Sequence, residues 1–172
     1  NKAVQDVIAE AIPMQRHAFT SEKLDAEHLR QLASNIPQGY QLKQMDLNLA
    51  TQLASERSEF ASTHMVNFDS PEDFIARGFG FCILAGEEIV CAGTTFAFCS
   101  KGIEIQISTR EKQRRKGLAT AVAAQLLTYC LHNNLDPHWD AENERSASLA
   151  RKLGYTPQGN YFMWLVVASR SK

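Results

Sequence analysis

A basic run around one glycine is the part of this sequence best suited to binding an anion. The run consists of Arg114, Arg115, Lys116, Gly117, Leu118, Ala119 and Thr120. It follows a strand-like stretch and opens a helix-like one, so its backbone N–H groups and the positive end of the helix dipole would point to one place. Gly117 and Ala119 are small enough for a phosphate to approach the backbone. These features predict a pyrophosphate site, although a solvated surface loop has the same composition.

A P-loop is the obvious rival for such a site, and the sequence excludes it. That motif needs a glycine, four residues, a second glycine and then lysine followed by serine or threonine. Here Lys116 precedes Gly117, and no second glycine lies upstream at the required spacing. A nucleotide-binding protein of that class is therefore not expected.

A second polar constellation follows further along the chain. Asn143 and Ser146 lie on the same side of a predicted helix as Leu149 and Leu153, by the helical period. Asn143 stands at the start of that helix, just after a strand-like stretch that ends at residues 140–141. The amide and the hydroxyl can therefore contact a ligand at that strand edge, or Asn143 can simply cap the helix.

Periodicity predicts the elements that would position these groups. The expected strands are 40–45, 80–85, 89–98, 103–109, 137–141 and 162–167, and the expected helices are two within 1–36, one after Asp46, one from Ser70 to Gly78, one over 117–133 and one over 144–153. Asp46 and Ser70 are the predicted N-caps, and Gly154 is the predicted residue after the last helix. Helices, a meander and a strand–helix–strand ending together predict a mixed α/β sheet rather than a bundle or a sandwich.

The basic turn and the segment from Asn143 to Tyr155 together resemble the acetyl-CoA-binding half of the GCN5-related N-acetyltransferases (GNAT superfamily). The segments 117–120 and 139–141 are most similar to a bacterial subgroup that includes zwittermicin A resistance acetyltransferases. The resemblance implies an α/β fold whose mixed, mostly antiparallel sheet splays between two central strands and is flanked by helices. We expect residues 1–38 to form a helical N-terminal extension and residues 39–172 the GNAT domain.

The resemblance also implies how a co-substrate, acetyl-CoA, would bind. Its pantetheine arm would pair with the backbone of Ile107, Ser108 and Thr109, where their strand splays from the strand 137–141. Its pyrophosphate would lie on the basic turn, and Asn143 and Ser146 would touch the other side of the arm. The acceptor would enter from the opposite end, near the helices of 46–77.

The implied activity is transfer of the acetyl group to a primary amine of a small molecule by direct attack in a ternary complex. A protein base must then take a proton, because a primary amine with a pKa of about 10 is mostly protonated at neutral pH. A backbone N–H near Ile107 and Ser108 would stabilise the oxyanion. A non-catalytic acyl-CoA-binding or sensor module of the same fold is the alternative.

Three carboxylates are candidates for the base. Glu104 is the first, because it alternates with Ile103 and Ile105 and so faces away from their packed side. Asp140, at the mouth of the splayed strand, is the second, and Glu142 is a poor third. The alternatives are an ordinary solvated position for Glu104 and a favourable charge at a helix start for Asp140.

The sequence departs from the family at two positions. Ala150 stands where many members carry a tyrosine that protonates the leaving thiolate, and Arg115 replaces the first glycine of the usual turn. A thiol with a pKa of about 8.5 leaves tolerably as the thiolate, so turnover does not require that acid. Tyr129, Tyr155 and Tyr161 are candidates to replace it, although Tyr155 is expected in the core.

Composition limits the remaining classes of function. The 172 residues are 44% hydrophobic, which suits one well-buried domain. The net charge of -1 and pI of about 6.6 indicate no nucleic-acid or anionic-membrane surface. No apolar run reaches the length of a membrane span, and no signal segment opens the chain. The identity of the acceptor and the oligomeric state are left open.

Cysteine and histidine usage indicates no metal site and a reducing compartment. Cys82, Cys91, Cys99 and Cys130 form no C-x-x-C pair, and none of the five histidines has a second ligand at metal spacing. Buried, reduced thiols in a cytoplasmic protein are therefore expected. The first residue is Asn1 rather than Met, so we expect that processing or truncation removed an earlier segment.

Overall fold

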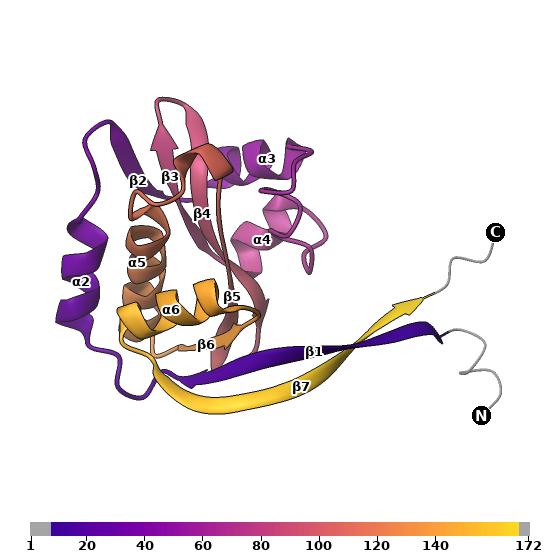
Figure 1. Ribbon diagram of the computed structural model, residues 1–172. Coiled ribbons are helices and arrows are strands. Elements are labelled where there is room, and N and C mark those ends of the chain that lie inside the picture. Colours follow the sequence, from indigo (N-terminus) through magenta and orange to yellow (C-terminus); the bar gives the residue numbers. More distant parts are fainter. Residues whose placement is uncertain (1–7, 169–172) are drawn as a thin grey trace.

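The computed structural model describes residues 8–168, which build one seven-stranded sheet with helices packed on it (Figure 1). The strands are β1 (Ile8–Thr20), β2 (Tyr40–Gln44), β3 (Gly80–Ala85), β4 (Glu88–Phe98), β5 (Gly102–Thr109), β6 (Asp136–Ala141) and β7 (Thr156–Ala168). The helices are α2 (Ala26–Ser34), α3 (Leu47–Ser55), α4 (Pro71–Arg77), α5 (Leu118–His132) and α6 (Glu144–Leu153), with a 3-10 turn η1 (Glu111–Gln113). The sheet order is β2-β3-β4-β5-β6-β1-β7.

Strand direction confirms the mixed, mostly antiparallel sheet. β5 and β6 run parallel, and the other paired strands of the described chain run antiparallel. The β5–β6 pairing covers only three register positions, the last of them Glu104 opposite His138. Beyond that position the two strands separate, which confirms the expected splay between the two central strands.

The N-terminal segment corrects one expectation. Residues 8–20 were predicted to be helical, as part of two helices within 1–36, and they form the strand β1 instead. β1 lies between β6 and β7, with His17 opposite both Ala141 and Asn160. Its partners are strands from the far end of the sequence, so nothing in the local pattern reveals them, although Pro13 disfavours a helix there. The second predicted helix is confirmed as α2. The predicted domain boundary between residues 38 and 39 falls in the turn before β2, and residues 1–7 lie outside the described part of the chain.

Alternating side chains place two apolar clusters on the two faces of the sheet. Phe81 and Ile83 of β3 pack with the buried side of α5, while Cys82 and Leu84 pack with Phe74 and the other side chains of α3 and α4. Each fully buried leucine, isoleucine or phenylalanine contributes about 1.5–3 kcal/mol. The sheet is therefore fixed between α5 on one side and the α3–α4 region on the other (Figure 1).

Local start and stop signals are confirmed. The Asp46 carboxylate accepts from the N–H of Leu49 at 2.9 Å, and the Ser70 hydroxyl accepts from the N–H of Asp73 at 3.2 Å. Gly154 ends α6 with φ 104°, a left-handed conformation that favours glycine. No helix in the described residues is long and apolar enough to cross a membrane.

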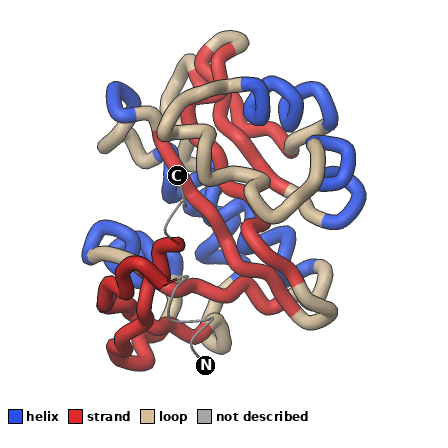
Figure 2. The backbone as a smooth tube through the Cα atoms, turned by 90° about the vertical axis from the view of Figure 1, so that its right-hand side faces the viewer, coloured by secondary structure: helices blue, strands red, loops and turns tan. Residues whose placement is uncertain are grey.

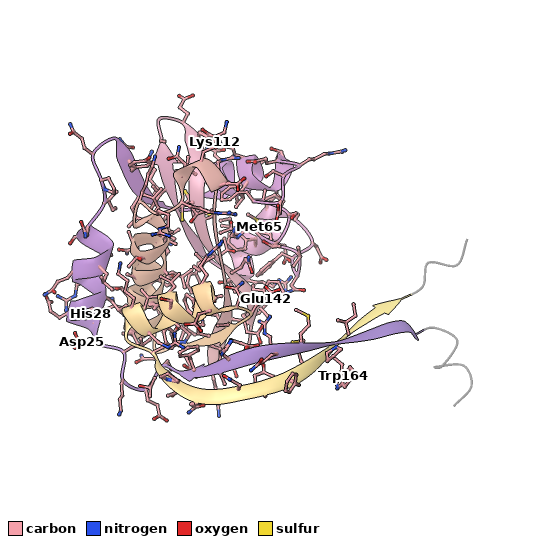
Figure 3. All side chains as sticks on the ribbon, in the orientation of Figure 1. Asp25, His28, Met65, Lys112, Glu142 and Trp164 are labelled. Carbon is pink, nitrogen blue, oxygen red and sulfur yellow. The ribbon has the colours of Figure 1, made fainter. Side chains whose placement is uncertain are left out.

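β1 and β7 continue past the rest of the sheet as a two-stranded ribbon (Figure 1). Figure 2 looks along the direction in which this ribbon projects, and in both views the segment between α3 and α4 lies above it. Phe162 and Trp164 are 69% and 61% exposed on one side of β7, and Tyr161 alternates to the other side. Trp164 is labelled in Figure 3.

Candidate functional site

The basic turn leads into α5 with open, unpaired backbone donors. Gly117 has φ 81°, and a Cβ added there would meet nothing within 4 Å. No side chain caps this helix start, so the N–H groups of Leu118, Ala119 and Thr120 have no acceptor within the helix. An anion at this point would meet several donors and the positive end of the dipole. The residues present thus fit a phosphate, and its binding at this turn stays a prediction.

The side chains of the turn are partly fixed by neighbours. Lys116 Nζ lies 2.8 Å from the Tyr40 hydroxyl and 2.7 Å from Gln113 Oε1. Arg114 lies 3.8 Å from a carboxylate oxygen of Glu111. Arg115 adopts φ 67°, so the residue that replaces the usual glycine keeps a left-handed backbone. Such a conformation costs about 1–2 kcal/mol for a residue with a Cβ.

The splay leaves one edge of β5 without a strand partner. Ile107, Ser108 and Thr109 pair with β4 through Gly93, Ala92 and Cys91, but in the described chain no strand pairs with their other edge. Their outward backbone groups are therefore available to an extended ligand, which can add as a strand does. This edge runs directly into the basic turn.

Asn143 and Ser146 lie across the splay at the start of α6. Asn143 Oδ1 accepts from the N–H of Ser146 at 3.0 Å, so the cap that the sequence offered as an alternative is present. The Ser146 hydroxyl accepts from Trp139 Nε1 at 3.1 Å. Capping does not use the amide N–H groups of Asn143, and its ligand contact stays a prediction.

The two leading carboxylates share one face of the sheet. Glu104 is opposite His138 in the register, and Asp140 is two residues beyond His138, so all three point to the same side. Ile103 and Trp139 point to the other side, into the core with α5 and α6. Glu104 is exposed, as the alternation predicted. The third candidate, Glu142, is exposed in the loop after β6 (Figure 3).

Asp140 is held by residues from two other strands. Arg16 donates from Nε to Asp140 Oδ2 at 3.1 Å and from Nη2 to the backbone oxygen of Asp140 at 3.0 Å. The Tyr161 hydroxyl donates to the same Oδ2 at 2.7 Å. Sequence reasoning missed Arg16, because residues 8–20 were read as helix and only their place in the sheet brings this guanidinium to β6.

The segment between α3 and α4 covers the far end of the same face. His64 Nδ1 lies 2.7 Å from Thr94 Oγ1, and its Nε2 lies 2.6 Å from Ser108 Oγ. Burial lowers the pKa of His64 to about 4, so the ring is neutral near pH 7. Gln106 Nε2 also donates to Thr63 at 2.9 Å. The polar side of β5 therefore contacts this segment, in which Figure 3 labels Met65.

A pocket of about 280 Å³ opens within this segment. It is lined by Ala54, Glu56, Ala61, Ser62, His64, Met65, Phe68, Asp69, Ser70 and Pro71. Glu56 is bound by both terminal nitrogens of Arg110, at 2.8 and 2.5 Å. The hydrogen bond from Arg110 holds the pKa of Glu56 below its usual value, so this wall of the pocket carries a carboxylate already paired with a cation.

The three tyrosine candidates differ in their surroundings. Tyr155 is buried and donates to the backbone oxygen of Pro137 at 2.7 Å, which confirms its place in the core. Tyr129 packs against Phe79, with ring centroids 4.5 Å apart. Tyr161 is 44% exposed on the face of Glu104 and Asp140. Ala150 is fully buried.

The cysteines are free, and three of them are buried. Burial raises the pKa of Cys82 to about 11 and that of Cys91 and Cys130 to about 12. The expectation of a buried thiol is wrong for Cys99, which is exposed in the turn between β4 and β5. Among residues 8–168, no three His, Cys, Asp or Glu side chains gather as a metal site would require.

Similarity to known proteins identifies the family of this chain. A family model described as GNAT acetyltransferase matches residues 1–164. The Bacillus subtilis (strain 168) protein YdfB, described as an uncharacterized N-acetyltransferase, is 29% identical over 153 residues, or 88% of this chain and 56% of that protein. The chain thus spans little more than half the length of that relative.

Solved structures of similar proteins have the same fold as this chain. A GCN5-related N-acetyltransferase-like protein from Streptococcus suis 89/1591 is 33% identical with a TM-score of 0.83, over 95% of this chain and 67% of that one. An acetyltransferase of the GNAT family from Colwellia psychrerythraea, 14% identical with a TM-score of 0.57 over 95% of this chain and 59% of that one, shares the fold.

Proposed function

The chain belongs to the GNAT acetyltransferase family, and on that premise we propose that it moves the acetyl group of acetyl-CoA to a primary amine of a small molecule. The observation that carries the proposal is the separation of β5 from β6 after Glu104, with the open edge of β5 leading to the bare start of α5. An acyl-CoA needs both an edge for its extended arm and donors for its phosphates.

Each part of acetyl-CoA has proposed partners. The pyrophosphate binds the N–H groups after Gly117 and the charges of Arg114, Arg115 and Lys116. The pantetheine arm pairs with residues 107–109, and Asn143 and Ser146 contact its other side. Support comes from the free edge of β5 and from the open space around Gly117.

The proposed chemistry is direct attack in a ternary complex. The acceptor nitrogen forms a bond to the thioester carbon, the C–S bond breaks, and the sulfur leaves as the thiolate. The proton of the amine passes to a protein base, and a backbone N–H near Ile107 and Ser108 stabilises the oxyanion. Glu104 is the leading base and Asp140 the second, because both stand on the open face at the mouth of the splay.

The acceptor is proposed to approach over that open face. Its boundaries are the segment between α3 and α4, which covers Ser108, and the β1–β7 ribbon, which carries Tyr161. We place the reaction in the cytoplasm, since four free cysteines suit a reducing compartment. No nucleic-acid or membrane partner is proposed. The narrower likeness to zwittermicin A resistance acetyltransferases also stays a prediction.

A second candidate is a non-catalytic acyl-CoA sensor. The observation that favours it is Ala150, which removes the tyrosine that many family members use as an acid and is fully buried. Such a protein binds acyl-CoA with the same turn and strand edge but transfers nothing. The two candidates differ only in turnover.

Thiol release and calorimetric binding, measured on one sample, test both candidates. Wild-type protein should bind CoA and release thiol from acetyl-CoA with at least one member of an amine panel. Gly117→Glu should abolish binding, because it places an anion where the pyrophosphate lies. Gly159→Glu is the matched control, since Gly159 also has positive φ and open space but lies on β7. Binding without turnover would leave the sensor, and no binding would refute both.

A further inference from the structure

Three side chains from three strands form one hydrogen-bonded group on the open face. Arg16 comes from β1, Asp140 from β6 and Tyr161 from β7. The register sets them beside one another, with Arg16 opposite Tyr161 and Ala18 opposite Asp140. The side chains of Arg16 and Asp140 are 19% and 36% exposed, so the pair is partly shielded from solvent. The Asp140 carboxylate is therefore held from two directions.

We propose that Arg16 and Tyr161 are positioning residues that fix Asp140 as an anchor for the ammonium group of the acceptor, while Glu104 alone takes the proton. This inference rests on the proposed function and deepens it by giving the two carboxylates separate roles.

The hydrogen bonds of Asp140 support its role as an anchor. A guanidinium and a phenol both donate to Oδ2, and charge-assisted hydrogen bonds of this kind hold the carboxylate in one orientation. Among residues 8–168, no side chain is hydrogen-bonded to Oδ1 of Asp140. That oxygen can accept an N–H of the acceptor, and its place is fixed before the acceptor arrives.

The surroundings of Glu104 differ. Within the described part of the chain this side chain makes no ion pair or hydrogen bond, so it can move toward an amine and accept its proton. It also lies at the last position of β5 that pairs with β6, where the splay begins. An exposed carboxylate that no described side chain holds suits a base at that point better than one that is held by two donors.

Tyr161 links the two carboxylates electrostatically. Its pKa is raised, first by the hydrogen bond to Asp140, then by burial and the charge of Asp140, and also by the charge of Glu104. The hydroxyl therefore keeps its proton and directs it to Asp140. This arrangement makes Tyr161 a donor that orients a carboxylate, and it gives the N-terminal strand, through Arg16, a part in acceptor binding.

Steady-state kinetics with an amine that the wild-type protein acetylates separates the two roles. Asp140→Asn and Tyr161→Phe should raise the acceptor KM about 10-fold and leave kcat within about 3-fold, since the anchor would bind the acceptor equally in the ground state and the transition state. Glu104→Gln should lower kcat about 100-fold or more with little change in KM. The acceptor KM of Arg16→Lys should lie between that of wild type and that of Arg16→Leu. Lysine keeps the positive charge but cannot reproduce the two hydrogen bonds of the guanidinium to Asp140.

Phe162→Leu is the matched control, because Phe162 is the neighbour of Tyr161 on the opposite side of β7. It should leave acceptor KM unchanged, and all variants should melt within a few degrees of wild type. A fall in kcat at constant KM in Asp140→Asn would make Asp140 the proton acceptor and overturn the proposal. Unchanged kinetics in both Asp140→Asn and Tyr161→Phe would also overturn it.

A binding measurement keeps this test separate from the proposed function. Butylamine, 1,4-diaminobutane and phenethylamine are titrated calorimetrically into the protein saturated with CoA. At least one should bind, with about 10-fold weaker affinity in Asp140→Asn. If none binds to wild type, the anchor is refuted. If an amine binds in an Asp140-dependent way but no thiol is released with any amine, the transfer reaction is refuted and the anchor stands.

Discussion

His64 Nε2 lies 2.6 Å from the hydroxyl oxygen of Ser108, which fastens the segment between α3 and α4 to the middle of β5. Ser108 Oγ also donates to the backbone oxygen of Phe60 at 2.9 Å, and Thr94 lies 2.7 Å from the other ring nitrogen. One imidazole thus joins two neighbouring strands to the segment that borders the open face. Because the ring is neutral near pH 7, this connection responds to acid.

Acidification should weaken the folded protein through His64. Its pKa is about 4 in the folded state, against about 6.5 when unfolded, so the folded state binds fewer protons. The contribution of neutral His64 to the free energy of unfolding is fully present above pH 6.5 and is lost as the pH falls toward 4. It amounts to about 3 kcal/mol in total. Urea unfolding at pH 7.5, 6 and 5 measures it.

His64→Gln is the comparison for that measurement. This variant should be less stable at pH 7.5 because it loses a well-bonded ring, yet its stability should fall less between pH 7.5 and 5 than that of wild type. The difference between the two curves isolates His64 from the carboxylates that also titrate. Parallel curves would contradict a buried, neutral His64.

Gly102→Ala should push β5 away from β6 at the position where the two strands are still paired. A Cβ at Gly102 would overlap the backbone oxygen of Asp136, its register partner on β6. Backbone atoms cannot rotate away, so we expect a loss of about 3 kcal/mol in the free energy of unfolding and weaker CoA binding. Gly39→Ala, with φ 88° but open space, should lose only about 1–2 kcal/mol from backbone strain. Equal losses would argue against the clash.

Two substitutions at Arg115 separate the effect of its backbone strain from the effect of its positive charge. Arg115→Gly and Arg115→Ala both remove a positive charge beside the proposed phosphate site, so both should weaken CoA binding about 2- to 5-fold, more at low salt. Only glycine relieves the left-handed backbone, so the glycine variant should be about 1 kcal/mol more stable than the alanine variant. Calorimetry gives the first quantity and thermal unfolding the second. A glycine variant no more stable than alanine would refute the strained turn.

Thiol labelling should distinguish the exposed Cys99 from the three buried cysteines. The buried thiols of Cys82, Cys91 and Cys130 have raised pKa values and little access to reagent, whereas Cys99 is exposed. At pH 8 a disulfide reagent should therefore modify one thiol rapidly and the other three only after denaturation. Cys99→Ser should remove the rapid phase. Its persistence in that variant would show that a buried cysteine is accessible.

Features with short-range causes were predictable from the sequence. The caps at Asp46 and Ser70, the end of α6 at Gly154 and the meander of β3, β4 and β5 depend on residues within a few positions of each other. Alternation along β5 was enough to place Glu104 on the open face. Tyr155 was also expected in the core, and it is buried there.

Features with distant causes were not predictable in this way. Residues 8–20 have no strand signal that outweighs their polar, alanine-containing pattern, and they become a strand because β6 and β7 supply partners on both sides. The contacts of Arg16 with Asp140 follow from that pairing alone. His64 is similar, because its partners Thr94 and Ser108 come from two strands that lie elsewhere in the sequence.

The place of β1 between β6 and β7 also constrains the order of assembly. Residues 8–20 are synthesised long before their partners, and His17 must wait for Asn160, 143 positions later, to make its hydrogen bond. Closing so large a loop is slow, so the strand order makes this half of the sheet a late step of folding. Until β7 leaves the ribosome, the edge of β1 that faces β7 is unpaired, and a chaperone or another chain can capture it.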